Sequence, residues 1–382
     1  MKKRLMFVLA VIVAFSMVLA ACGGGGAATP PPDSETTTSG GDTTPSEPTT
    51  TPAAPDETYE FIVSVTLGEP VSPNWARLFK ELQERSGGRL VTDNNIYWSG
   101  SLVPIPEIPK GFATGALAFG NLPSPNYPDV LPLSTRILNL PFLGLQDAVG
   151  SAEIWMQLYS EFPAIQAEFE SFNIKVVGAT TLGMYGLHFV DKKEVRKPSD
   201  LQGRKIVPYS TTFLPLLEAN NAAGSYIPPG QIYESLEKGV VDGYVNNWAF
   251  QGWFGLSELM EQHVDLGPYG AFHEWNLLCM DKSFYDALPQ DLQQLIDDVY
   301  WNEGGFKDLW QDTSDLVDNE RKKATEADNL MTVLDGDELQ VWKDALLPIH
   351  EPELAEIASL CGDVAYDIYD RAVELIAEKW GN

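Results

Sequence analysis

The sequence predicts an α/β protein with a largely parallel sheet, in a chain long enough for two lobes. Residues 59–382 exceed the size that a single hydrophobic core usually reaches. The whole chain is 44% hydrophobic and contains 10 Trp, 14 Tyr and 17 Phe, which is a globular composition. From residue 61 onward, segments with strand-like alternation are followed by segments with helical spacing, an order typical of α/β folds.

The first elements follow from apolar spacing and from helix-end residues. Alternating apolar side chains over 61–67 predict a strand. Ser72 as N-cap and Pro73 in the first turn predict the start of a helix, which Gly87 is expected to end. The apolar face of this helix consists of Trp75, Leu78, Phe79 and Leu82. The elements predicted next are a strand over 90–98, a helix over 106–114 and a strand over 116–120.

The remaining elements continue the same alternation. The pattern predicts, in chain order, a helix carrying residues 154–162, strands over 174–180, 187–190 and 205–208, a helix over 231–238 and a strand over 240–245. Gly239 directly follows that helix and suits a left-handed C-terminal cap. The last third is expected to be mainly helical, with apolar stripes at 292–299 and 368–376.

The first 21 residues are expected to be a lipoprotein signal peptide. Three basic residues precede an apolar run over 5–19, which is too short for a comfortable membrane span. The run ends in Leu19-Ala20-Ala21-Cys22, which matches the bacterial lipoprotein motif, so we expect acylated Cys22 to anchor the chain to the lipid membrane. An ordinary secretory signal is the alternative. Residues 22–58 are rich in Gly, Thr and Pro and predict a disordered tether.

Charge and cysteine content limit the partners. The formal net charge is −29, with 54 acidic and 25 basic residues, so we expect no nucleic-acid partner, because phosphate binding relies on clustered Lys and Arg. The acidity is interpreted as a solvated surface. Cys279 and Cys361 remain besides Cys22. They form a disulfide or stay as two thiols, and the sequence leaves both alternatives open.

Motifs for catalysis or cofactors are weak. His273-Glu274 lacks the second histidine of a zinc-protease helix, and neither GxSxG nor a phosphate-binding loop occurs. We therefore expect no enzyme activity, no cofactor and no metal site. An exported hydrolase that uses a pair of carboxylates is the alternative from another functional class, because two acidic residues suffice for that chemistry.

Four segments together are more specific than any single motif. They are Leu140-Pro141-Phe142-Leu143, Lys197 to Ile206 (KPSDLQGRKI), Ile232 to Gly243 (IYESLEKGVVDG) and Phe284 to Pro289 (FYDALP). In order and spacing they resemble the dicarboxylate-type (DctP) solute-binding proteins of TRAP transporters, over nearly all of residues 59–382. The chain is therefore expected to be an extracytoplasmic receptor, anchored at the cytoplasmic membrane, that captures a small organic solute.

The resemblance implies a two-lobed periplasmic-binding-protein-like fold of type II, with hinge strands and a helical C-terminal region. It places residues 59–184 and 273–312 in lobe I, and residues 185–272 and 313–382, with the C-terminal helices, in lobe II. The lobes would close on the solute and deliver it to TRAP-type permease subunits driven by an ion gradient. We expect a monomer in which the helix over 364–380 packs on its own domain; some relatives use such a helix to dimerise. A sensory lipoprotein without a permease is a further alternative.

The resemblance also shows where this chain departs from the family. The arginine that pairs with a substrate carboxylate is replaced by Val207, and a second arginine position falls near Leu187. Either Arg204 or Arg136 supplies the charge for an organic acid, which the resemblance favours, or the solute is neutral, aromatic or cationic. Asn246 is the first candidate ligand residue, by motif; Tyr209 and Trp98 each follow a strand. The other candidates are Tyr185, Trp75, Trp248, Trp275 and Asn121.

Overall fold

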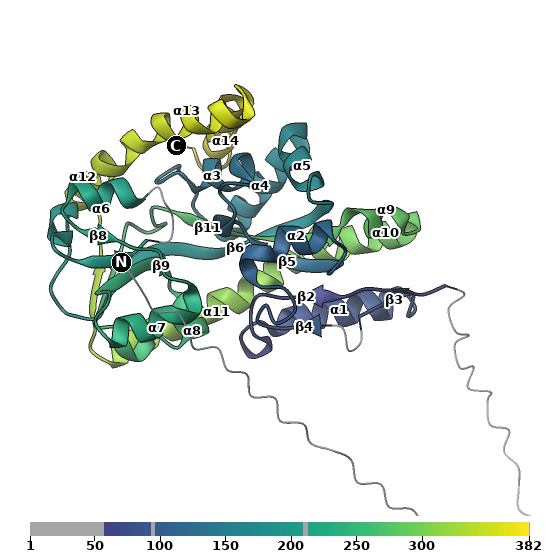
Figure 1. Cartoon of the computed structure of the whole chain (residues 1–382), viewed down its shortest axis with the longest axis horizontal. Coiled ribbons are helices and arrows are strands. Elements are labelled where there is room, and N and C mark those ends of the chain that lie inside the picture. The colour runs from purple at the N-terminus through teal and green to yellow at the C-terminus, as the bar shows by residue number, and fades with distance from the viewer. Residues whose placement is uncertain (1–56, 93–95, 209–212, 382) are drawn as a thin grey trace, which may run out of the picture. The chain divides into compact units, whose positions relative to one another are not determined.

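The computed structural model describes residues 57–92, 96–208 and 213–381. The chain divides into two units, 1–52 and 53–382, and every element described below belongs to the second (Figure 1). The predicted signal peptide, Cys22 and almost all of the predicted tether lie outside the described residues. Within the described ranges, no helix has both the length and the apolar character needed to cross a bilayer.

A ten-stranded mixed sheet forms the centre of the second unit. Its main order is β4-β2-β5-β11-β6-β9-β7-β8, β10 pairs with both β6 and β12, and β1 and β3 pair separately. The strands are β1 (Tyr59–Glu60), β2 (Val63–Ser64), β3 (Leu90–Val91), β4 (Ile96–Tyr97), β5 (Phe119–Pro123), β6 (Ile174–Phe189), β7 (Lys205–Val207), β8 (Ala223–Gly224), β9 (Gly243–Asn247), β10 (Gln262–Asp265), β11 (His273–Asp281) and β12 (Leu330–Val333).

The prediction of separate strands over 174–180 and 187–190 is wrong, because β6 is one strand of 16 residues. Its first part pairs with β11, and its second part, from Tyr185, pairs with β9 and β10. Gly183 lies between the two parts with φ +100°, a conformation that favours glycine, opposite an irregularity in the pairing with β11. The glycine therefore bends the strand without ending it, and β6 runs through both halves of the sheet (Figure 1).

The sheet is parallel, as expected, only in the pairings that do not involve the long strands β6 and β11. Among the described strands, six pairings are parallel and four are antiparallel. Every antiparallel pairing includes β6 or β11. The sequence reading did not predict β11, since all nine of its residues are buried and no alternation marks the strand.

Every helix predicted with its own residue range is present. The helices are α1 (Pro73–Arg85), α2 (Ile108–Ala113), α3 (Pro132–Arg136), α4 (Ala148–Glu161), α5 (Pro163–Glu170), α6 (Leu214–Ala219), α7 (Pro229–Glu237), α8 (Ala249–Phe254), α9 (Lys282–Ala287), α10 (Gln290–Asp297), α11 (Gly305–Glu326), α12 (Gly336–Leu346), α13 (His350–Cys361) and α14 (Val364–Trp380). Ser72 is the N-cap of α1, although its side chain makes no capping hydrogen bond, and the four predicted apolar residues of α1 are buried. Gly239 has the expected positive φ after α7.

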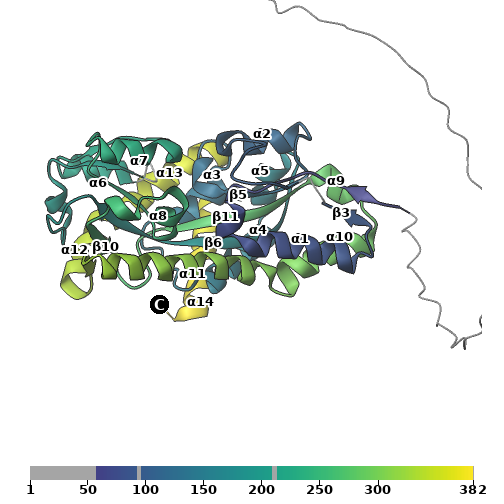
Figure 2. The same ribbon diagram turned by 90° about the horizontal axis from the view of Figure 1, so that it is seen from below.

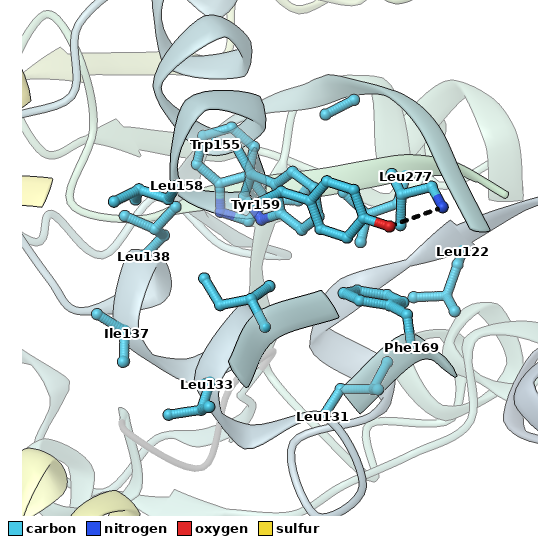
Figure 3. Packing of buried hydrophobic residues seen from close by; sticks show 14 of the residues in the cluster. Leu122, Leu131, Leu133, Ile137, Leu138, Trp155, Leu158, Tyr159, Phe169 and Leu277 are labelled. Atoms are coloured by element: carbon cyan, nitrogen blue, oxygen red, sulfur yellow. Dashed lines mark hydrogen bonds between the residues drawn. The ribbon is translucent and has the colours of Figure 1, made fainter. Parts of the chain in front are cut away.

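The largest core cluster lies between the sheet and α3, α4 and α5. Trp155 stacks on Tyr159 at 5.7 Å between ring centroids, and Phe169 meets both rings edge-on at 5.9 Å. Figure 3 shows these rings above Leu131, with the Val176 amide donating to the Tyr159 hydroxyl. A second cluster surrounds α1, and two further clusters cover the half of the sheet formed by β7, β9 and β10.

The two C-terminal helices belong to the first cluster. Ile357 of α13 and Ile368, Ala372 and Leu375 of α14 are buried there with residues of α3 and α4. The expected division, which placed 313–382 as a whole in lobe II, stays a prediction. The apolar face of α14 is buried within its own unit, as expected for a helix that packs on its own domain.

Helix α11 contacts α1 near its start and the turn after α8 near its end. Near its start, Asp312 accepts hydrogen bonds from the Asn74 backbone and side-chain amides at 2.9 and 2.7 Å. Near its end, Glu320 accepts a hydrogen bond from the Ser257 hydroxyl and pairs with Lys323 at 2.7 Å. Figure 2 shows α11 running beside α1 and on toward β10.

Of the two alternatives for Cys279 and Cys361, the structure shows two free thiols and not a disulfide. Cys279 is fully buried on β11, and Cys361 is partly buried at the end of α13. Both are unpaired cysteines in the structure.

Candidate ligand-binding cleft

A cleft of about 500 Å³ lies between α3 with its following turn and the strands β7 and β9. One wall contains Asn126, Arg136 and Asn139, and the opposite wall contains Val207, Tyr244, Asn246 and Phe250. A larger hollow of about 730 Å³ is lined by α4, α5, α9 and α10, without residues of β7 or β9. Of these two hollows, the 500 Å³ cleft is the one that contains the motif asparagine, and its walls come from the segment after β5 with α3 on one side and from β7 and β9 on the other.

Asn246 is held in a defined orientation on β9. It is 3% exposed, and its Oδ1 accepts a hydrogen bond from the Asn247 backbone amide at 2.7 Å. Its Nδ2 has no hydrogen-bond partner within the described residues. The arrangement leaves a side-chain donor for a bound molecule.

Two buried polar atoms of the cleft residues have no partner within the described part of the chain. They are the Oδ1 of Asn139 and the hydroxyl of Tyr244. Burial raises the pKa of the Tyr244 hydroxyl well above its ordinary value, so the group keeps its proton. Because an unsatisfied buried polar atom is costly, these atoms indicate where a solute or ordered water would bind.

Arg136 lines the cleft, but two carboxylates already pair with it. Its Nε donates to Glu353 at 2.6 Å, and a second guanidinium nitrogen lies 3.1 Å from Glu356. Burial alone lowers the pKa of Arg136, but the hydrogen bond and the charge of Glu353, together with Glu356, raise it overall. Arg136 is therefore a permanent cation whose charge is balanced inside the protein.

Arg204 does not line the cleft. Its guanidinium forms two hydrogen bonds with Asp191, at 2.9 and 3.1 Å, donates to the Lys193 carbonyl at 2.6 Å and lies over the Phe189 ring. The side chain is 4% exposed. Of the two arginines considered as substitutes for the family arginine, only Arg136 is placed to meet a solute. Val207 itself lines the cleft, as the motif alignment implied.

The other predicted residues that the structure describes lie apart from the cleft lining. Trp75 and Trp275 are buried in the core clusters, and Trp98 packs partly buried against the cluster around α1. The Trp248 indole donates to Asp265 at 2.8 Å, and the Tyr185 hydroxyl donates to Glu274 at 3.1 Å.

Asn121 also has an internal role. Its side-chain amide donates to Thr66 and Asn276 at 2.6 and 2.7 Å, and its oxygen accepts from the Thr66 backbone amide. Tyr209 lies outside the described residues.

Asn139 and Phe250 line the cleft but were not among the residues predicted from the sequence. Asn139 directly precedes Leu140-Pro141-Phe142-Leu143, so a search of the positions flanking that motif would have found it. Phe250 carries no local signal, because its position depends on how α8 follows β9. No group of three or more His, Cys, Asp or Glu suited to a metal occurs in the described ranges.

Comparison with known proteins shows the family and the fold. The sequence model of bacterial extracellular solute-binding proteins of family 7, DctP, matches residues 64–356. The ectoine-binding periplasmic protein TeaA of Halomonas elongata is 25% identical over 308 residues, which cover 78% of this chain and 84% of TeaA. A solute-binding protein of Chromohalobacter salexigens is 22% identical over 75% of this chain and 82% of its own.

Solved structures show the same fold. A marine-metagenome TRAP solute-binding protein specific for aromatic acids, with 3-hydroxybenzoate, has a TM-score of 0.74 at 20% identity, covering 85% of this chain and 99% of its own. A TRAP solute-binding protein of Rhodoferax ferrireducens with copurified benzoate has a TM-score of 0.73 at 20% identity, covering 84% and 98%. The match over residues 64–356 identifies the chain as a member of the DctP family, family 7 of the bacterial extracellular solute-binding proteins.

Proposed function

We propose that this protein captures a small organic solute in the cleft beside Asn246 and delivers it, unchanged, to TRAP-type permease subunits. The observation that carries the proposal is the cleft itself. One wall comes from the segment after β5 and from α3, and the other comes from β7 and β9. Together they offer an amide donor on Asn246 and two buried polar atoms that have no partner in the described part of the chain. Such convergent polar groups in a largely apolar cleft are typical of small-molecule sites.

The proposed capture step is hinge closure. Lobe I is proposed to comprise 59–184 and 273–312, and lobe II to comprise 185–272 together with part of 313–382. The packing of α13 and α14 with α3 and α4 supports moving these two helices to lobe I. Strands β6 and β11 are the proposed hinge strands, and a solute that contacts both walls would stabilise the closed state.

An organic acid is the proposed solute class. The related solved structures contain benzoate, 3-hydroxybenzoate, D-glucuronate and orotic acid. In this chain Arg136 is the cation in the cleft lining, and Asn246 is the nearby donor for a carboxylate. The alternative is a neutral or cationic solute. It is supported by the two carboxylates on Arg136 and by Asp129, which also lines the cleft.

A thermal-shift screen followed by calorimetry tests the proposal. The panel comprises aromatic acids, dicarboxylates, uronates, 2-oxo acids, quaternary amines, ectoine and sugars. A true solute at about one hundred times its Kd adds roughly 2.7 kcal/mol of stability. Asn246→Ala should abolish that shift, whereas Asn302→Ala is the matched control, because this exposed asparagine donates to Asp298 outside the cleft. A shift that persists in Asn246→Ala would place the solute elsewhere.

The same samples separate receptor from hydrolase. A receptor returns the solute unchanged after denaturation and extraction, while the hydrolase alternative predicts conversion with time. Adjacent genes for small and large membrane subunits would favour transport over a sensory role.

Anchoring through acylated Cys22 is a separate proposal, supported by the motif that precedes this cysteine. Cys22→Ser should release the protein from the membrane fraction. Unchanged membrane association of this variant would contradict the anchor, and it would leave the proposal for the cleft intact.

A further inference from the structure

Two buried histidines lie directly behind the asparagine of the cleft. His188 is on β6 and His263 is on β10, and both are at most 1% exposed. Their Nδ1 atoms are 2.8 Å apart, and the Nε2 of His188 is 3.1 Å from the backbone carbonyl oxygen of Asn246. The Nε2 of His263 is 3.1 Å from the side-chain nitrogen of Asn329, which follows α11.

The Asn246 carbonyl at one end of this chain of hydrogen bonds and the Asn329 amide at the other determine which ring nitrogen of each histidine carries the proton. A carbonyl oxygen only accepts, so His188 must carry its proton on Nε2. Its Nδ1 is then an acceptor and requires a proton on the Nδ1 of His263. The Nε2 of His263 must in turn accept, and its neighbour is the amide nitrogen of Asn329, which also donates to the Met260 carbonyl at 2.8 Å.

The surroundings keep both rings neutral and in place. Burial, above all, lowers the pKa of His188 to about 3 and that of His263 to about 2. The Trp248 ring stacks on His263 at 4.4 Å between centroids, and its indole nitrogen donates to Asp265. Arg321 pairs with the same carboxylate at 2.8 Å, so the nearest charges to the pair balance each other.

The peptide unit between Asn246 and Asn247 connects these hydrogen bonds to the cleft. Its carbonyl oxygen accepts from His188, and its N–H donates to the Oδ1 of Asn246. Rotation of this peptide unit would therefore turn the Asn246 side chain as well. The imidazole of His188 restrains one end of the unit, and the side-chain oxygen of Asn246 is fixed at the other end.

We propose that His188 and His263, in opposite tautomers, are positioning residues that orient the Asn246 amide toward the solute. The hydrogen-bond chain begins at Asn329, next to the end of α11, and finishes at the cleft. The part that concerns the solute rests on the function proposed above, whereas the tautomers and the restraint on the peptide unit do not depend on any ligand.

The first test reads the tautomers directly. In the intact chain with ¹⁵N-labelled histidine, long-range ¹H–¹⁵N correlation spectra resolve only four imidazoles. We expect His188 protonated on Nε2 and His263 on Nδ1, both still neutral at pH 5. His188→Gln and His263→Asn assign the signals. The same tautomer in both rings, or an imidazolium signal at pH 6 from either, would overturn the proposal.

The second test measures how strongly His188 restrains the peptide unit between Asn246 and Asn247. His188→Leu should raise the exchange rate of the Asn247 amide about tenfold, because a hydrogen bond that holds its peptide unit is lost. In His188→Gln the side-chain Nε2 can replace the imidazole donor, so the wild-type rate should return. His350→Leu is the matched control, since that imidazole contacts Tyr369 and the Pro141 carbonyl. Equal exchange in the Leu and Gln variants would refute the positioning role.

The third test links the pair to binding, with 3-hydroxybenzoate and D-glucuronate as probes. For a probe that binds the wild type, His188→Leu should weaken the affinity about five- to tenfold and His188→Gln should restore it. Undiminished binding in His188→Leu would refute the link. If neither probe binds the wild type, the proposed solute class is wrong, and the tautomers and exchange rates still decide the role of the histidines.

Discussion

Glu353→Gln tests whether the cleft binds the carboxylate of a solute at Arg136. Glu353 and Arg136 both line the cleft, with side chains 12% and 11% exposed and 2.6 Å between the paired atoms. The substitution keeps the size of the side chain and removes one negative charge. A solute carboxylate bound to Arg136 would share its guanidinium with Glu353, and the two acceptors would then lie about 5 Å apart, because one guanidinium spans roughly that distance.

The repulsion that the substitution removes can be estimated. Two unit charges about 5 Å apart repel by roughly 3 kcal/mol at an effective dielectric constant of 20. Solvent at the mouth of the cleft reduces this to about 1–2 kcal/mol, which corresponds to a roughly five- to thirtyfold lower Kd for an acid. A cationic solute should instead bind more weakly by a similar factor.

Calorimetry at low ionic strength measures the change in Kd directly. A melting shift is unsuitable on its own, because Glu353→Gln also weakens the contact between α3 and α13. Glu356→Gln is the matched control: its side chain is 63% exposed, and an exposed ion pair contributes little. Unchanged or weakened binding of an organic acid in Glu353→Gln would refute the view that Arg136 receives its carboxylate.

Three further predictions concern stability and reactivity. Trp155→Ala should lower the free energy of unfolding by about 3–5 kcal/mol in denaturant titrations, because this fully buried ring packs on two others; a loss below about 1 kcal/mol would contradict the packing. Burial raises the pKa of Glu168 to about 7, so its carboxyl favours the folded state below about pH 4.5 and loses that contribution as the pH rises through 7. The stability of Glu168→Gln relative to wild type should therefore increase between pH 5 and 8, and a constant difference would exclude the shift. In a Cys22→Ser background, a thiol reagent should label Cys361 in the native protein and Cys279 only after unfolding, since burial raises the pKa of the Cys279 thiol; rapid native labelling of Cys279 would refute its burial.

Local patterns in the sequence determined the family and several of the helices, among them α1, α7 and α14. The four motifs are short and contiguous, and the match over 64–356 confirms the family that they indicated. The apolar stripes of α1 and α14 repeat at helical spacing, so the buried faces of these helices were predictable without tertiary information. Gly239 as a helix cap is likewise a local backbone requirement.

Only the tertiary structure decided the continuity of β6 and the chemistry of the cleft. A glycine within a strand reads locally as a break, and the pairing with β11 on one side and β9 on the other shows that β6 continues. Arg136 meets Glu353 across 217 residues of sequence, and His188 meets His263 across 75. No periodicity encodes such distant pairs, because they depend on how whole elements pack, and that packing determines which charges and hydrogen-bond donors remain for a solute.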